Sequence, residues 1–189
     1  KFTGLFEIAP SAAGLVYKYY GEKFSRDYAE LVLQTDRIDS ADLTLDEILH
    51  PENYPYVILS QTISSRNKHD APYWDKLVEL LWKNDISVVL KDKEVAKRVK
   101  LAISNNKIYA ETLKRCTTEQ QNVSISDFTR EVKNVSGNRF LIYSLFPNSN
   151  VNIKISEHPE DNKMFMLNLG HSILNKTCQV NVGTLLKRY

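Results

Sequence analysis

Three aspartates spaced three residues apart give this sequence its clearest potential for chemistry. Asp36, Asp39 and Asp42 lie in the run TDRIDSAD. If that segment is helical, the three side chains share roughly one face. Carboxylate oxygens are hard ligands that suit Mg²⁺ or Mn²⁺, and a cation held there can turn water into a nucleophile and neutralise a phosphate. Acidic residues near a helix end are also common partners of the helix dipole, so spacing alone leaves both interpretations open.

His171 is a second residue with chemical potential, because it closes a predicted strand in the run LGHS. The glycine before it lets a ligand approach the backbone. A surface histidine without a ligand is the alternative that local context leaves open. The sequence has no nucleophile elbow, phosphate-binding loop or dinucleotide fingerprint, which removes support for the enzyme classes that use them.

The composition is that of a globular protein. The 189 residues are 42% hydrophobic and 25% charged, which excludes a collagen-like, disulfide-scaffold or fully disordered chain. The 25 Lys and Arg residues against 23 Asp and Glu residues leave a net charge of +2, so a nucleic-acid ligand would need a local basic patch. No apolar run approaches the ~20 residues that span a bilayer, and the first ten residues do not resemble a signal peptide. We therefore expect no membrane association.

The two cysteines, Cys116 and Cys178, are expected to be reduced thiols in a cytoplasmic protein. They form no Cys-x-x-Cys pair, which removes support for a zinc or dithiol site. A low cysteine content without a secretory signal is typical of a reducing compartment.

Helical periodicity dominates the first half of the sequence. Ser11 precedes a segment with apolar residues at helical spacing, and Ser25 is the expected cap of the next helix. Residues 35–56 are less regular, and residues 86–90 fit a strand or a turn. Asp70 is expected to cap a further amphipathic helix, whose apolar stripe consists of Trp74, Leu77, Val78 and Leu81.

Residues 92–115 predict one long helix with its apolar positions on one side. Its basic positions lie mostly elsewhere; they are Lys93, Lys97, Arg98, Lys100 and Lys107. Such residues can form a nucleic-acid stripe, but they are more often a solvated helix face, and Glu94 interrupts the run.

Strand periodicity replaces helical periodicity after Thr118. Apolar and polar residues alternate in residues 123–125, 151–156 and 165–169, a pattern typical of strands. Residues 140–146 fit a helix, and the last eight residues form a short amphipathic piece.

These elements predict an α/β fold with two parts. A mostly helical N-terminal lobe is joined by the long helix to an α+β C-terminal lobe. The expected domain bounds are 1–90 for the first lobe, 91–118 for the connecting helix and 119–189 for the second lobe.

Several runs of the sequence resemble DHH-family phosphoesterases. The run APSAAGLVY is similar to the stretch that follows the Asp-His-His signature of that family, and DRIDSA is similar to its fourth motif, whose aspartate binds the catalytic metal. The run GHSILN and the final run VNVGTLLKRY resemble the DHH-associated C-terminal domain, in which the final run leads into a Gly-Gly-Gly-His loop. The likeness covers nearly the whole sequence, and the similar proteins are exopolyphosphatase-like or oligoribonuclease-like.

The resemblance implies a metal-dependent hydrolase of phosphodiester or phosphoanhydride bonds in short oligonucleotides, cyclic dinucleotides or related phosphates. Asp39 would bind the metal, Mn²⁺ or Mg²⁺, and Asp36 would be its neighbour. The family's other metal motifs and its glycine-rich loop would lie outside this sequence. We therefore expect a segment of a longer protein that is inactive by itself, with residues 1–90 from the DHH domain and 119–189 from the DHH-associated substrate-binding domain.

The resemblance also implies contacts for phosphate or sugar in the C-terminal lobe, at Arg139, His171, Ser172 and Asn175. Arg139 suits a phosphate because its guanidinium can bond two oxygens at once. The expected partners are a small phosphorylated substrate or short oligonucleotide, and a second copy in a homodimer. The alternative is a catalytically silent module that binds nucleotides or regulates a partner chain, since the near-neutral charge and the missing ligands permit it.

Overall fold

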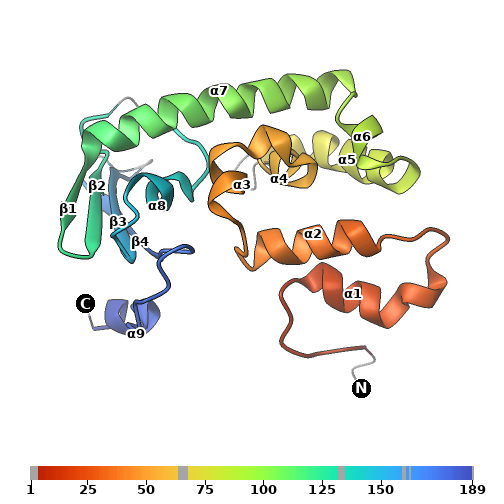
Figure 1. The fold of residues 1–189 in the computed structure, drawn as a ribbon, viewed down its shortest axis with the longest axis horizontal. Helices are drawn as coiled ribbons and strands as arrows, with labels where there is room; N and C mark the ends of the chain where they lie inside the picture. The colour runs from red at the N-terminus through yellow and green to blue at the C-terminus, as the bar shows by residue number, and fades with distance from the viewer. Residues whose placement is uncertain (1–3, 64–67, 132–134, 159–160, 162, 189) are drawn as a thin grey trace. The chain divides into compact units, whose positions relative to one another are not determined.

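The computed structural model describes residues 4–63, 68–131, 135–158, 161 and 163–188, so Tyr189, the last residue of the C-terminal run, lies outside the described residues. The chain divides into two compact units, Lys1–Lys100 and Leu101–Tyr189, and each is described by itself. The first unit is helical, and the second holds a four-stranded sheet with helices (Figure 1), which confirms the predicted fold class. The narrower assignment of domain bounds stays a prediction.

The first helix, α1 (Ala12–Tyr20), begins where the sequence predicts it. Ser11 is its cap, because the Ser11 Oγ accepts a hydrogen bond from the N–H of Gly14 at 3.1 Å. A 3₁₀ turn, η1 (Gly21–Lys23), follows directly.

The predicted cap of the second helix at Ser25 is wrong. Helix α2 (Ala29–Asp39) follows Tyr28, and the carboxylate of Asp27 accepts the N–H of Ala29 at 2.8 Å. The hydroxyl of Tyr17 on α1 donates to the same carboxylate at 2.9 Å. A contact between the two helices therefore sets the start of α2, and local sequence does not reveal such a contact.

The end of α2 separates the three aspartates. Ala41 adopts the left-handed conformation with φ 58°, and the N–H of Asp42 turns back to donate to the carbonyl of Arg37 at 2.8 Å. Asp36 and Asp39 consequently share the last turn of α2, whereas Asp42 lies beyond it.

The stretch that looks irregular in the sequence folds as three short helical pieces. They are α3 (Leu45–Leu49), the 3₁₀ turn η2 (Pro51–Asn53) and α4 (Pro55–Ser60). Thr44 and Glu47 form a capping box at the start of α3. A proline opens each of the other two pieces, where its missing N–H is not needed.

Apolar side chains from four segments form the core of the N-terminal unit. A 3₁₀ turn, η3 (Lys68–Asp70), leads into α5 (Ala71–Lys83), and α6 (Ile86–Val89) follows, so the predicted strand or turn at residues 86–90 is helical. Leu77 of the predicted stripe is buried, but Val78 is 68% exposed. The buried cluster consists of Leu59, Tyr73, Leu77, Val89 and Val95.

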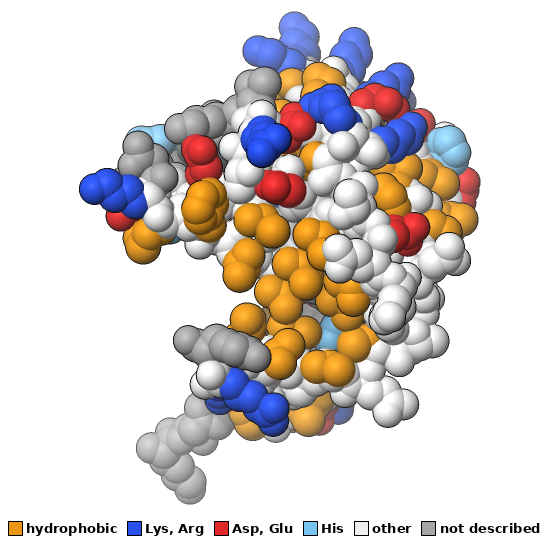
Figure 2. Space-filling view, turned by 90° about the vertical axis from the view of Figure 1, so that its left-hand side faces the viewer, with side chains coloured by type: hydrophobic (Ala, Val, Ile, Leu, Met, Phe, Trp, Pro, Cys, Tyr) orange, Lys and Arg blue, Asp and Glu red, His pale blue; other side chains and the backbone are white. Residues whose placement is uncertain are grey.

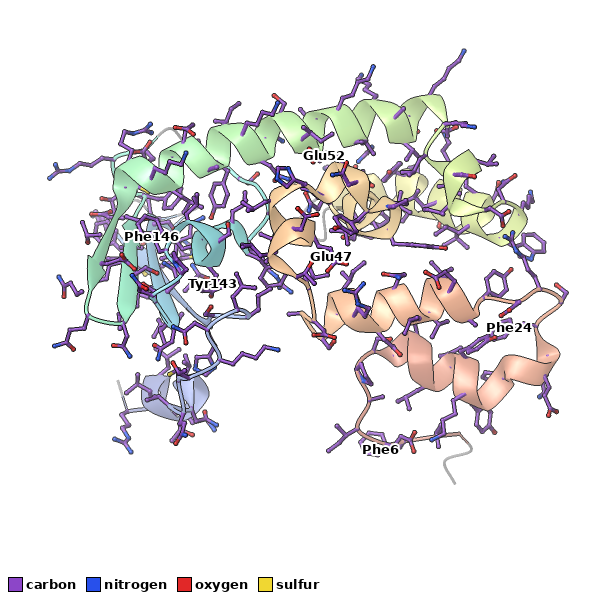
Figure 3. All side chains as sticks on the ribbon, viewed as in Figure 1. Phe6, Phe24, Glu47, Glu52, Tyr143 and Phe146 are labelled. Atoms are coloured by element: carbon purple, nitrogen blue, oxygen red, sulfur yellow. The ribbon has the colours of Figure 1, made fainter. Side chains whose placement is uncertain are left out.

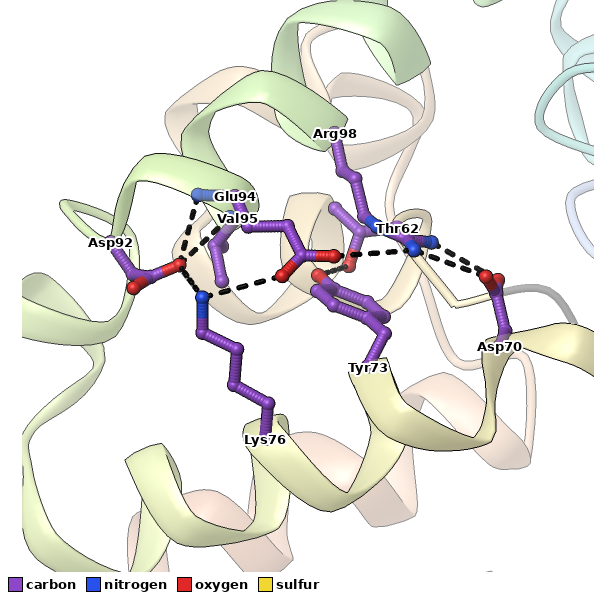
Figure 4. Close-up of polar contacts among 8 residues, drawn as sticks. All are labelled: Thr62, Asp70, Tyr73, Lys76, Asp92, Glu94, Val95 and Arg98. Atoms are coloured by element: carbon purple, nitrogen blue, oxygen red, sulfur yellow. Dashed lines mark hydrogen bonds and ion pairs between the residues drawn. The ribbon is translucent and has the colours of Figure 1, made fainter.

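Asp70 does not cap α5 through its side chain, in contrast to the prediction. Its two carboxylate oxygens accept hydrogen bonds from both terminal nitrogens of Arg98, each at 3.0 Å (Figure 4). The Arg98 guanidinium also lies 3.7 Å from the ring centroid of Tyr73. Arg98 is therefore not part of a solvated face, and it fastens the long helix α7 (Lys93–Cys116) to α5.

The C-terminal unit is built on one mixed sheet. Strands β1 (Thr117–Gln120), β2 (Val123–Asp127), β3 (Val151–Glu157) and β4 (Phe165–His171) lie in chain order, with antiparallel outer pairs and a parallel central pair. The sequence predicts the last three strands but not β1, because its residues, TTEQ, do not alternate in polarity. Two short helices, α8 (Leu141–Leu145) and α9 (Val182–Leu186), complete the unit.

Helices α7 and α8 contact the same face of this sheet, here called the covered face. Lys154 lies on it, with its ammonium 5.3 Å from the ring centroid of Tyr109 on α7. Gly170 lies on it too, against the hydroxyl of Tyr143 on α8 (Figure 3). No helix in the described part of the chain is long and apolar enough to cross a membrane.

Candidate functional site

The two carboxylates at the end of α2 have different surroundings. Asp36 is half-buried, and its Oδ1 accepts a hydrogen bond from the hydroxyl of Ser11 at 2.5 Å. A side chain at Gly14 would bring its Cβ to 2.8 Å from the same oxygen. Ser11 and Gly14 at the start of α1 therefore hold the Asp36 carboxylate in one place.

Asp39 carries the free carboxylate of the pair. Its side chain is exposed, and it has no hydrogen-bond or ion-pair partner among the residues that the structure describes. It lies three residues after Asp36 and thus on the same side of α2. Asp42 is also exposed, but it lies outside the helix, where its charge raises the pKa of Arg37 as a smaller contribution beside the bonded Glu47.

The chemistry of Asp39 fits a hard divalent cation, since an unpaired carboxylate keeps its oxygens available for coordination. One carboxylate is not a metal centre, however. Within the described residues, no three His, Cys, Asp or Glu side chains are grouped so that they could hold a metal ion. The described residues therefore hold no complete metal centre by themselves.

Ser172 and Asn175 fasten the loop after β4 to the rest of its unit. The Ser172 side chain is buried, and its Oγ accepts the backbone N–H groups of Leu174 at 3.2 Å and Asn175 at 2.9 Å. The amide nitrogen of Asn175 donates to the carbonyl of Asn148 at 3.1 Å. Both side chains therefore form hydrogen bonds within the protein. The sequence did not predict that they stabilise this loop.

His171 and Arg139 are both exposed but do not share a face of the sheet. His171 pairs with Val151 and therefore projects from the face opposite the covered one. Arg139 precedes α8, and its guanidinium lies 4.6 Å from the ring centroid of Phe140. The structure thus places His171 at the end of β4, Ser172 and Asn175 in the loop that follows it, and Arg139 beside the helix that covers the other face.

Tyr143 is a residue near this loop that the sequence did not single out. Its ring is buried beneath α8, and burial raises the pKa of its hydroxyl to about 12, while the charge of Arg139 acts in the opposite direction. The hydroxyl would lie 2.6 Å from a Cβ at position 170. Glycine at this position therefore serves the packing of α8 on the sheet, in addition to any approach of a ligand.

The comparisons with known proteins found similarity to a solved structure. No family model matches the sequence, and no curated protein matches it. The chain superposes on the pGpG-specific phosphodiesterase PggH from Vibrio cholerae with a TM-score of 0.83 and 27% sequence identity. The match covers 96% of this chain but 63% of PggH, so the chain spans less than two thirds of that protein.

The match covers 96% of the chain and therefore extends over both of its units. The two proteins share a fold along almost the entire chain, together with 27% sequence identity. The chain therefore has the fold of a pGpG-specific phosphodiesterase, and its resemblance to phosphoesterases of the DHH kind is confirmed.

Proposed function

We propose that this chain is the greater part of a DHH-family phosphodiesterase that cleaves short linear oligonucleotides, with a dinucleotide as the favoured length. The observation that carries the proposal is the fold shared with PggH over 96% of the chain. The near-neutral charge agrees with it, because a substrate of one or two phosphates needs a few local contacts rather than an extended basic surface.

The proposed metal ligand is Asp39, for Mn²⁺ or Mg²⁺. Its free carboxylate supports the assignment, and the Asp36 carboxylate, fixed by Ser11, keeps the neighbouring turn of α2 in position. A divalent cation in such an enzyme supplies an activated water and neutralises charge on the phosphate. The ligands that complete the centre belong to parts of the protein outside residues 1–189, so this chain alone is expected to be inactive.

The proposed substrate contacts divide into two kinds. His171 and Arg139 present exposed cationic or hydrogen-bonding groups and are assigned to phosphate or sugar. Ser172 and Asn175 are assigned an indirect role, in which they hold the shape of the loop after β4, because their side chains already bond to backbone groups. The free cysteines, Cys116 and Cys178, agree with a cytoplasmic protein.

The test uses the complete protein with Mn²⁺ and a panel of phosphoesters: a linear dinucleotide, a cyclic dinucleotide, a longer oligonucleotide and polyphosphate. Asp39→Ala should lower turnover at least about 100-fold, in line with the loss of a metal ligand, and leave the unfolding midpoint unchanged. Asp42→Ala is the matched control, since it removes an exposed carboxylate from the same segment. Normal turnover in Asp39→Ala would contradict the assignment.

A non-catalytic nucleotide-binding or regulatory module is the second candidate function. The observation that favours it is the lack of a three-ligand cluster in the described residues. The two candidates separate in one experiment, because a silent module binds the dinucleotide in the complete protein without hydrolysing it at any Mn²⁺ concentration.

A further inference from the structure

The positive charge of this chain is concentrated on one helix. Helix α7 carries seven Lys and Arg residues against two Glu residues, a net charge of +5 over 24 residues. The whole sequence has 25 basic and 23 acidic residues, so without α7 there remain 18 basic and 21 acidic residues, a net charge of −3. The near-neutral total therefore conceals one strongly basic helix.

The basic residues of α7 are of two kinds. Three of them form ion pairs with carboxylates of the chain, and they are Arg98, Lys114 and Arg115. The other four, here called the lysine row, are exposed and have no ion-pair partner among the residues that the structure describes; they are Lys93, Lys97, Lys100 and Lys107.

The two glutamates of α7 do not neutralise the lysine row. Glu94 pairs with Lys76 and with Arg98. Glu111 pairs with Lys114 at 2.9 Å. An exposed helix face is often crossed by ion pairs between residues three or four positions apart, but here both carboxylates bond to cations outside the row, which keeps its charge.

Helix geometry places the lysine row along one side of α7. Lys93, Lys100 and Lys107 are seven residues apart, so each is turned by only about 20° from the one before. Lys97 lies within about 40° of Lys93, and the row is about 21 Å long at 1.5 Å per residue. The spacing follows from one uninterrupted helix. Figure 2 shows Lys and Arg side chains projecting at the top of the view, the side on which Figure 1 draws α7.

The lysine row does not stabilise the helix that carries it. Lys93 is the first residue of α7, where the positive end of the helix dipole disfavours a cation. Lys97 lies four residues after Lys93 and three before Lys100, and like charges at these spacings destabilise a helix. The fold therefore gives no reason for this arrangement, which points to an anion outside the chain.

The chemistry of the row restricts which anion fits it. Tyr109, the aromatic residue of α7, is buried, so the row offers no ring on which a base could stack. Leu101 and Ile108 are exposed on the same helix, but two side chains do not make the apolar centre of an interface with a folded protein, from which lysine is normally depleted. Lysine ammonium groups act as point charges for phosphate. A stacked polynucleotide carries a phosphate about every 3.4 Å, so about six phosphates match the length of the row.

We propose that the lysine row binds the sugar–phosphate backbone of a single-stranded polynucleotide, without reading its sequence. A dinucleotide has too few phosphates to engage the whole row, so the row binds only longer polynucleotides. It would hold the protein on molecules whose breakdown by other nucleases releases short oligonucleotides. The proposal does not depend on the proposed activity, because none of the residues assigned to metal or substrate lies on α7.

The test measures binding of a fluorescent oligouridine of about 20 nucleotides to the complete protein, by anisotropy between about 50 and 200 mM salt. EDTA prevents metal-dependent cleavage, and an excess of unlabelled linear dinucleotide fills the proposed substrate site. The wild-type protein should bind the oligouridine under these conditions, with an affinity that falls as the salt concentration rises. Asp39→Ala should bind it equally well, so the outcome is separate from that of the proposed metal site.

Two triple variants with the same change of charge separate the row from the net charge. The test variant combines Lys93→Gln, Lys100→Gln and Lys107→Gln. The control variant changes three exposed lysines elsewhere in the N-terminal unit, by Lys18→Gln, Lys23→Gln and Lys83→Gln. The test variant should lose at least about tenfold in affinity at about 50 mM salt, and its logarithmic salt slope should be flatter by about 2, since each phosphate contact on a single-stranded polynucleotide contributes about 0.7. The control variant should behave like the wild type.

Arginine at the same three positions of the row keeps the charge and should preserve binding. The glutamine test variant should unfold at a temperature no lower than that of the wild type, because it removes repulsion within α7. A lower unfolding temperature would show that the row serves the fold. Absence of binding by the wild-type protein, displacement of the oligouridine by the dinucleotide, or equal losses in the test and control variants would each overturn the proposal.

Discussion

The two units of this chain bury different kinds of side chain against their helices. In the N-terminal unit the buried cluster is apolar, with Leu59, Leu77 and Val89 at its centre. In the C-terminal unit the surface beneath the helices contains Ser124, Ser126 and Asn152, joined by hydrogen bonds. The helices of the C-terminal unit bury apolar side chains of their own, such as Leu113, Leu141 and Ile142. The difference lies in the sheet beneath them, which contributes polar groups that pair with one another.

This difference shows that the spacing of apolar residues and the side on which they lie carry separate information. The alternation in residues 151–156 and 165–169 correctly predicts strands. The assumption that the apolar residues of a strand face the helices, however, would assign the wrong face of this sheet to the interior. The consequence for stability is that a truncation in the N-terminal unit costs buried area, whereas one on the covered face leaves hydrogen-bonding groups without partners.

The largest effect on stability is expected from Leu77→Ala in the apolar cluster. Leu77 is 4% exposed, and truncating such a side chain typically costs about 2–5 kcal/mol. Denaturant unfolding measures the change, and Val78→Ala, on the exposed side of the same helix, should stay within about 0.5 kcal/mol of wild type. Equal losses for the two variants would show that the cluster is not the core of this unit.

Asn152→Leu tests the polar hydrogen bonds on the covered face of the sheet, the counterpart of the apolar cluster. The substitution removes the donor that serves both buried hydroxyls and should cost about 1–3 kcal/mol, although it adds apolar volume. Combining it with Ser124→Ala and Ser126→Ala should recover part of the loss, because paired removal of polar groups is close to neutral. A single variant as stable as wild type would mean that the covered face tolerates apolar groups and that the comparison between the units fails.

Gly170→Ala tests how closely α8 lies on the covered face. The new Cβ would meet the Tyr143 hydroxyl at 2.6 Å, and overpacking of this size costs about 1–3 kcal/mol. Tyr143→Phe removes that oxygen, so the double variant should regain most of the lost stability. If thermal unfolding shows the same loss with and without Tyr143→Phe, the contact is not the cause.

The smallest effect, and the one that depends on pH, concerns the ion pair between Asp70 and Arg98 in the N-terminal unit. The two hydrogen bonds from Arg98 hold the pKa of Asp70 below its ordinary value near 3.8. A lowered folded-state pKa gives a stabilisation that is complete above the ordinary pKa and is lost as the pH falls through the folded one. Asp70→Asn should therefore destabilise the chain at pH about 7 and converge towards wild type at pH about 3, as measured by urea midpoints. An equal difference at both pH values would rule out this linkage.

Local signals predicted the features that local contacts determine. Ser11 as the cap of α1, the long helix and three of the strands follow from residue type and period. The cap at Ser25 and the strand or turn at residues 86–90 were wrong, because Tyr17 of α1 bonds to Asp27 and α6 packs into the core. Asp70 stands at the predicted cap position of α5, but its carboxylate bonds to Arg98 instead of to the start of the helix.

The candidate site shows the same limit. The family resemblance implied Asp39 as the metal ligand, and local context left open a surface position for His171; both side chains are exposed in the structure. Neither signal indicated the partners of Ser172 and Asn175. The Ser172 hydroxyl accepts N–H groups of its own loop, whereas the Asn175 amide donates to the carbonyls of Pro147 and Asn148, far away in the sequence. Whether Asp39, Arg139 and His171 perform the proposed roles stays a prediction for the experiments above.

The hydrogen bonds of Asn152 also determine how the two central strands align. A shift of one residue between β2 and β3 would exchange the faces, as in any sheet. A shift of two residues keeps the polarity of both faces, so apolar burial alone does not oppose it, but it would move Asn152 away from the hydroxyls at positions 124 and 126. In this unit, therefore, polar side chains such as Asn152 help to specify the strand alignment that hydrophobic contacts specify in most sheets.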